Sequence, residues 1–111
     1  ELETSLDGVL HKVQTKLKDA NGKIILLSCG DVGTAPFFPR LVAPLWSRRT
    51  RQVRGMFMRV AEKYGVRYVD LYRDKEHDVF RQDPARYYAG DSFHPSSEGY
   101  RVWFEEIQKV L

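Results

Sequence analysis

The sequence predicts a single α/β domain over residues 1–111, built on a parallel sheet. Residues 23–29 form a short, continuous apolar run that is typical of a strand covered on both faces. Residues 66–71 form a second run, rich in β-branched and aromatic side chains. Between the two runs, residues 45–64 repeat apolar side chains at helical spacing. Because neighbouring parallel strands require such a crossover helix, we expect a right-handed βαβ unit.

The composition is that of an ordinary globular domain. The chain has 111 residues, of which 42% are hydrophobic and 13% aromatic, which suits one small packed core rather than a disordered segment. No apolar run approaches the length of a membrane span, and the first residues lack the basic flank and apolar stretch of a signal peptide. The single Cys29 excludes an internal disulfide and a cysteine-based metal cluster. We expect a soluble protein and leave its compartment open, because any signal peptide would lie before Glu1.

The net charge of +3 is unevenly distributed. The segment Arg40–Arg67 contains one acidic residue, Glu62, and the following basic residues: Arg40, Arg48, Arg49, Arg51, Arg54, Arg59, Lys63 and Arg67. We interpret this basic stripe as the solvated face of a helix, because no nucleic-acid motif or stacking platform accompanies it, and we expect no nucleic-acid partner. The alternative is a non-catalytic α/β interaction module that binds a polyanion through the stripe.

The first helix is expected to begin at a cap formed by Thr4 or Ser5. Its apolar stripe consists of Leu6, Val9, Leu10, Val13 and Leu17. The dipeptide Asn21-Gly22 then stops the helix, since both residues tolerate the left-handed conformation that ends helices. The strand of residues 23–29 follows directly.

The loop after this strand leaves its carboxyl end, the edge at which open α/β sheets bind ligands. Residues 30–34 match a phosphate loop only weakly, because they have neither the Gly-x-Gly-x-x-Gly spacing nor a following Lys-Ser/Thr. Prolines break up residues 35–45, so Phe37 and Phe38 lie in a loop. Two interpretations remain open for these phenylalanines: they line an acyl or substrate cleft, or they cover the core.

Gly65 is expected to end the helix of residues 45–64. After the second strand, residues 72–93 are long, charged and irregular, and only residues 83–86 indicate a short helical turn. Loops of that length in a compact domain are usually functional.

The last helix follows Pro95, which we expect in its first turn, with Ser96, Ser97 and Glu98 supplying capping oxygens and negative charge. Its apolar side consists of Tyr100, Trp103, Phe104, Ile107, Val110 and Leu111.

Asp91 and His94 stand where the long loop meets this helix. A carboxylate three residues before a histidine at such a junction can bond one ring nitrogen while the other faces outward, which is how a catalytic base is built. The alternative is that both residues only cap the helix.

The run Tyr-Ala-Gly-Asp-Ser-Phe-His-Pro-Ser-Ser-Glu-Gly-Tyr, from Tyr88 to Tyr100, resembles the last block of the SGNH (GDSL-type) esterases and lipases. The strand at Gly65–Asp70 is compatible with the same family. The resemblance implies a flavodoxin-like three-layer α/β/α sandwich with a parallel sheet. It also implies hydrolysis of a small-molecule acyl ester by a Ser-His-Asp triad, without a metal or organic cofactor. Within that triad, Asp91 would orient the imidazole and His94 would act as general base and acid.

Two blocks of that family are not found in the sequence. Val32 stands where the Gly-Asp-Ser block has its serine, no Gly-x-Asn-Asp segment supplies oxyanion-hole residues, and Ser28 is expected to lie within a strand. We therefore expect residues 1–111 to be the C-terminal portion of a longer SGNH hydrolase domain. Alone the chain should be inactive, because an acyl-enzyme requires a serine and oxyanion donors. The missing half, or self-association, would cover the sheet edge and helix faces left open.

Overall fold

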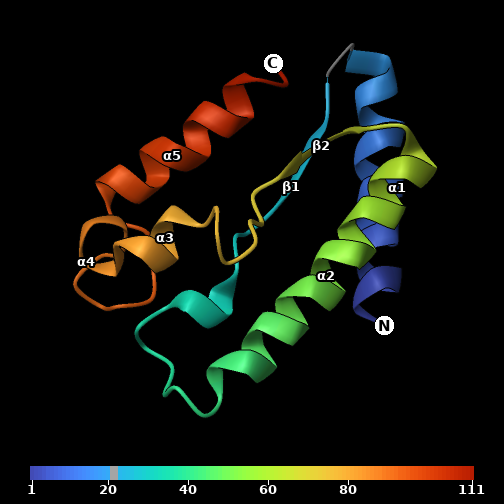
Figure 1. Ribbon diagram of the computed structural model, residues 1–111. Coiled ribbons are helices and arrows are strands. Elements are labelled where there is room, and N and C mark those ends of the chain that lie inside the picture. Colours follow the sequence, from blue (N-terminus) through green and yellow to red (C-terminus); the bar gives the residue numbers. More distant parts are fainter. Residues whose placement is uncertain (21–22) are drawn as a thin grey trace.

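The computed structural model describes residues 1–20 and 23–111 and shows an α/β fold with a parallel two-stranded sheet (Figure 1). In chain order the elements are α1 (Leu2–Ala20), β1 (Ile25–Ser28), the 3-10 helix η1 (Val32–Thr34), α2 (Ala43–Tyr64), β2 (Arg67–Asp70), α3 (Val79–Gln82), α4 (Pro84–Tyr87) and α5 (Ser97–Gln108). The strands pair from Ile25 opposite Arg67 to Ser28 opposite Asp70. The predicted α/β class and parallel pairing are confirmed.

Helix α2 is the crossover between the two strands, as predicted. It begins at Ala43 rather than at residue 45, because Pro44 fits the first turn, where its missing N–H breaks no helical hydrogen bond. Gly65 ends the helix with a φ of 63° and donates its N–H back to the last turn. Arg54 holds α2 to β2 through a bidentate contact with Asp70, at N–O distances of 3.0 and 2.5 Å.

Helix α1 begins earlier than predicted. The carbonyl of Glu1 already accepts the N–H of Ser5 at 3.0 Å. The prediction of a cap at Thr4 or Ser5 is therefore wrong, because main-chain acceptors complete the first turn before those side chains are reached. The stop predicted at Asn21-Gly22 lies outside the described residues.

Two ion pairs join α1 to α2. Arg59 contacts Glu3 at 3.0 Å and Lys63 contacts Asp7 at 2.5 Å. Of the apolar stripe predicted for α1, Leu10 alone is buried. Helix α1 therefore keeps much of its apolar face uncovered by the described residues.

The two strands lie between helices. Helices α1 and α2, which contact each other, lie to one side of them and α5 to the other (Figure 1). The buried apolar side chains are Leu10, Ala35, Val60, Ala61, Val69, Leu71 and Phe80. Leu27 of β1 is 40% exposed, so the prediction of a first strand covered on both faces is wrong at this position. The reason is that β1 has one neighbouring strand, and no described element covers the side chain of Leu27.

The stretch of residues 72–93 contains two short helices. Asp78 starts α3 by accepting the N–H of Phe80 at 3.0 Å, and this helix was not predicted. Helix α4 begins at Pro84, where the sequence predicts a helical turn. These helices fold the long stretch against α5, which α4 contacts directly.

Helix α5 starts at Ser97, and Ser96 caps it by accepting the N–H of Gly99 at 3.2 Å. Pro95 precedes the helix, so its predicted place in the first turn is wrong. The reason is a backbone pairing within the preceding turn: Pro95 forms an antiparallel bridge with Tyr88. On the predicted apolar side of α5, Tyr100 and Phe104 are 52% and 53% exposed.

Candidate active site

A pocket of about 240 Å³ opens at the carboxyl ends of both strands. Gly30 lines it just after β1, Leu71 just after β2, and Trp103 lines it from α5. His94 lies on the same wall. The fold therefore brings the candidate base from the sequence to the edge of the sheet at which α/β proteins bind ligands.

The loop that carries the candidate pair forms a tight turn. The N–H of Ala89 donates to the carbonyl of His94 at 2.8 Å, and the N–H of Ser92 donates to the carbonyl of Ala89 at 2.9 Å. Ser92 has a φ of 60°, a left-handed conformation that costs a non-glycine residue roughly 1–2 kcal/mol. The carbonyl of Ser92 accepts the N–H of Phe37 at 3.0 Å, which ties this turn to the loop after η1.

The structure brings Asp91 and His94 into direct contact. Oδ2 of Asp91 lies 2.5 Å from Nδ1 of His94, and Oδ1 accepts the N–H groups of Phe93 and His94, each at 2.9 Å. The bond with His94 first, and then these backbone bonds, lower the pKa of Asp91 to about 2. Asp91 is ionised at neutral pH and takes the hydrogen bond from Nδ1–H. In the neutral imidazole this leaves Nε2 as the proton acceptor.

The Nε2 atom of His94 is open to a reacting group. Among the described residues it forms no hydrogen bond, and the side chain of His94 is 64% exposed. The ring of Phe93 packs edge-on against the imidazole, with 5.0 Å between the centroids. An imidazole placed in this way can take a proton from a group that enters the pocket.

Phe37 and Phe38 pack against Phe93, the residue that contacts the imidazole of His94. Their rings pack on Phe93 at centroid distances of 5.7 and 5.8 Å, and Phe38 stacks on Trp46 at 4.8 Å. Neither phenylalanine lines the pocket that contains His94. Phe38 lines a neighbouring cavity and Phe37 is 63% exposed, so both interpretations left by the sequence stay open.

Sequence reasoning missed two polar residues in the pocket wall, Tyr88 and Asp78. The Oγ1 of Thr34 donates to the carbonyl of Asp31 at 2.8 Å, so the Tyr88 hydroxyl, 2.5 Å from Oγ1, is the donor of that bond. Burial raises the pKa of Tyr88 to about 12 and also raises the pKa of Asp78. The available signal for Asp78 was its position two residues before Phe80, as a helix cap, and the signal for Tyr88 was its place at the start of the run Tyr88–Tyr100.

The side chains of Ser28, Ser47 and Ser96 bond to groups other than His94. Ser28 is buried, with its Oγ 2.5 Å from the Tyr68 hydroxyl. Ser47 donates to Oδ2 of Asp31 at 2.9 Å. Within residues 1–20 and 23–111, no hydrogen bond joins a serine side chain to His94.

A second Asp-x-x-His pair, not singled out by sequence reasoning, lies in the long loop after β2. Nδ1 of His77 is 2.7 Å from Oδ1 of Asp74, which also accepts the N–H of His77 at 3.2 Å. His77 does not line the pocket of His94. The spacing of three residues was the visible signal for this pair.

Two other kinds of feature, a metal site and a membrane span, are absent from the part of the chain that the structure describes. No set of three histidine, cysteine or acidic residues is arranged to hold a metal ion there. None of the described helices combines the length and hydropathy needed to cross a membrane.

Comparison with known families gives one match. The GDSL-like Lipase/Acylhydrolase family matches residues 2–102, a range that includes both strands, the pocket residues and the Asp91-x-x-His94 turn. No curated protein and no solved structure gives a match.

Proposed function

Because the chain belongs to the GDSL-like lipase/acylhydrolase family, which confirms the resemblance seen in residues 88–100, we propose that it takes part in ester hydrolysis by a Ser-His-Asp triad. In this proposal the chain supplies His94 and Asp91. The supporting observation is the bond of 2.5 Å between Nδ1 of His94 and the Asp91 carboxylate, in a histidine that lines the pocket.

The chemistry follows from that bond. A serine hydroxyl attacks the ester carbonyl while Nε2 of His94 takes its proton. The tetrahedral intermediate then expels the alcohol, which receives the proton back from Nε2 and leaves an acyl-serine. Water repeats the sequence and releases the acid. Asp91 keeps Nδ1 protonated, so that Nε2 is the basic nitrogen, and stabilises the imidazolium that forms in each half. No step requires a metal or an organic cofactor.

The serine and the oxyanion donors are, in this proposal, supplied by a further segment of the hydrolase domain, of which residues 1–111 form the C-terminal portion. The segment would complete a flavodoxin-like three-layer α/β/α sandwich. Leu27 on the sheet and Tyr100 and Phe104 on α5 are exposed apolar side chains that it would cover. Self-association of the chain is the other way to cover them.

The substrate is proposed to be a small-molecule acyl ester. The pocket beside His94 has a mainly apolar wall, which includes Val32, Phe80 and Trp103, and a volume of about 240 Å³. This space fits a short acyl group better than a long chain.

A fluorophosphonate, which reacts with activated serines, tests the proposal. We expect the 111-residue chain to show no hydrolysis of 4-nitrophenyl acetate above that of its His94→Ala variant. A longer polypeptide that includes the serine segment should react with the fluorophosphonate, and His94→Ala should abolish the reaction. Fluorophosphonate-sensitive turnover by the 111-residue chain alone would overturn the division of the triad proposed here.

The alternative, a module that binds polyanions through the stripe Arg40–Arg67, is not favoured. Four of its basic side chains bind partners within the chain: Arg54 binds Asp70, Arg59 binds Glu3, Lys63 binds Asp7, and Arg67 binds the carbonyls of Val110 and Leu111. These internal pairs interrupt the stripe as a continuous cationic surface.

A further inference from the structure

A second cavity adjoins the pocket of His94. It is a groove of about 740 Å³ whose wall shares Asp31, Thr34 and Ala35 with that pocket. Four cationic side chains line it: Arg40, Arg51, Lys75 and Arg81. We call this cavity the basic groove.

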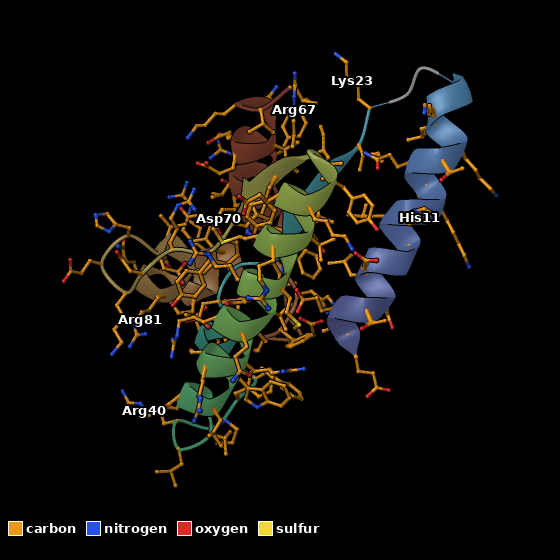
Figure 2. The ribbon with its side chains drawn as sticks, turned by 90° about the vertical axis from the view of Figure 1, so that its right-hand side faces the viewer. His11, Lys23, Arg40, Arg67, Asp70 and Arg81 are labelled. Carbon is orange, nitrogen blue, oxygen red and sulfur yellow. The ribbon has the colours of Figure 1, made fainter. Side chains whose placement is uncertain are left out.

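The four cations come from separate parts of the fold. Arg40 precedes α2, Arg51 lies on α2, Lys75 follows β2, and Arg81 belongs to α3. In Figure 2, Arg40 and Arg81 project to the same side of the molecule. Folding therefore gathers like charges that the sequence keeps apart.

These cations lack counterions among the described residues. No carboxylate there lies within ion-pair distance of any of the four, whereas Arg54, Arg59 and Lys63, which share α2 with Arg51, are all paired. Arg51 has one polar contact, at 3.5 Å from the Tyr72 hydroxyl. Like charges focused in a concave surface raise the local concentration of anions.

One acidic residue, Asp31, lines the basic groove. Its Oδ1 accepts the N–H of Gly33 at 2.9 Å and its Oδ2 accepts the hydroxyl of Ser47 at 2.9 Å. Both carboxylate oxygens are therefore committed to neighbouring segments, and Asp31 forms no ion pair with the four cations. The net charge of the lining remains positive.

We propose that the basic groove binds a phosphate-bearing small molecule. Guanidinium groups match phosphate oxygens with paired N–H donors, and the groove supplies three arginines. Its volume falls in the range of small-molecule sites, and the rings of Phe38 and Tyr72 offer apolar wall beside the charges. Because the groove shares a wall with the pocket of His94, the phosphate-bearing molecule is the ester substrate itself. This last step rests on the proposed function, whereas binding in the groove does not.

Calorimetric titration of the 111-residue chain with inorganic pyrophosphate tests the groove. The variant Arg51→Gln/Arg81→Gln should lose at least tenfold in affinity. The matched control is Arg48→Gln/Arg49→Gln, which removes the same charge from exposed positions of α2 outside the groove, and it should change affinity less than twofold. Arg51→Lys/Arg81→Lys should keep part of the affinity, which separates recognition from misfolding. Equal losses in the groove and control variants would overturn the proposal.

Two further probes identify the source of the phosphate. Vesicles of phosphatidylcholine and phosphatidylglycerol, or a single-stranded oligonucleotide, should not displace pyrophosphate at equal phosphate concentration. Displacement by either would overturn the assignment to a small molecule in favour of a membrane or a nucleic acid. His94→Ala should bind pyrophosphate like the unmodified chain. If pyrophosphate binds in the groove but the longer polypeptide does not react with the fluorophosphonate, the esterase function alone is rejected. If the longer polypeptide reacts but pyrophosphate does not bind, the proposal for the groove alone is rejected.

Discussion

Two Asp-x-x-His pairs occur in this chain, and their local geometries are nearly the same. The distance from carboxylate oxygen to Nδ1 is 2.7 Å in Asp74–His77 and 2.5 Å in Asp91–His94. In both pairs the aspartate also accepts backbone N–H groups. Its pKa is lowered in both, with the histidine bond as the largest cause. The spacing and the bond therefore describe a local turn and do not by themselves assign catalysis.

The two pairs differ in their surroundings. His94 lies on the wall of the pocket at the strand ends and packs on Phe93. His77 lies in the charged loop beyond β2, and its side chain and that of Asp74 are 71% and 67% exposed. The family match covers both pairs, so it does not choose between them. His77 lines a smaller cavity of about 130 Å³, so the difference is the place of His94 in the pocket at the carboxyl ends of both strands, where α/β proteins bind ligands.

The largest expected difference between the two pairs is the loss of kcat on replacing each histidine by alanine. In the complete hydrolase that we propose, with a further segment supplying the serine, His94→Ala should lower kcat on the order of a thousandfold or more, because proton transfer is lost. His77→Ala should leave kcat within about twofold, as expected for an exposed side chain away from the pocket. Both are measured by steady-state hydrolysis of 4-nitrophenyl acetate. If both variants are folded but His77→Ala has lost most of its activity and His94→Ala has lost little, the assignment of His94 as the catalytic base is wrong.

Substituting the two aspartates should give a difference in kcat that is similar to, or smaller than, the difference between the histidine variants. Asp91→Asn should lower kcat by roughly 10²- to 10⁴-fold, because an amide neither holds the correct imidazole tautomer nor stabilises the imidazolium. The effect should fall on kcat more than on KM, since the pocket is retained. Asp74→Asn is the matched control and should leave both constants unchanged. Equal losses in the two variants would indicate a structural role for such turns.

The titration of Asp91 provides a test in the 111-residue chain. Carboxyl ¹³C NMR should give it a pKa of about 2, below the ordinary value of 3.8. Because the folded pKa is the lower one, the bond contributes stability above pH 3.8, and this contribution is lost as the pH falls through 2. His94→Ala should raise the pKa of Asp91 part of the way back, since the backbone N–H bonds remain, and His77→Ala should not move it. An unchanged pKa in His94→Ala would show that the pair is not formed in solution.

Local patterns predicted the elements that depend on local chemistry. Apolar spacing gave the crossover α2, and the tolerance of glycine for a positive φ gave its end at Gly65. The place of Pro95 was wrong because the helix signals of residues 95–98 do not reveal that Pro95 pairs with Tyr88 across the preceding turn. Leu27 was expected to be covered because an apolar run does not reveal how many strands and helices surround it.

In the candidate site too, features set by neighbouring residues were predictable from the sequence, whereas contacts between distant residues were not. A spacing of three residues was enough to predict that Asp91 and His94 can meet. The basic stripe was visible in the sequence, but the pairing of Arg59 with Glu3, across 56 positions, was not. The basic groove was missed for the same reason, since Arg40 and Arg81 come together only through the tertiary fold.

The residue directly after the aspartate of each pair is Ser92 in one and Lys75 in the other. Substituting these residues should have the smallest effects, and these effects are on stability. Ser92 has a φ of 60°, and Lys75, which occupies the same place after Asp74, is not among the described residues with a positive φ. A β-branched residue is poorly tolerated in the left-handed region, so Ser92→Val should lower the free energy of unfolding by roughly 1–2 kcal/mol. Lys75→Val should change it by less than about 0.5 kcal/mol, as is usual for exposed positions.

Urea denaturation of the 111-residue chain measures both changes through the midpoint, provided that the slope stays constant. Ser92→Gly is the companion variant. It removes the conformational penalty but adds freedom to the unfolded chain, so its net effect should stay within a few tenths of a kcal/mol. If Ser92→Val and Lys75→Val were equally silent, the turn at Ser92 would not be held in the left-handed conformation. The two pairs would then differ only in the pocket beside them, and the orientation of His94 would have to come from Phe93 and the Asp91 bond alone.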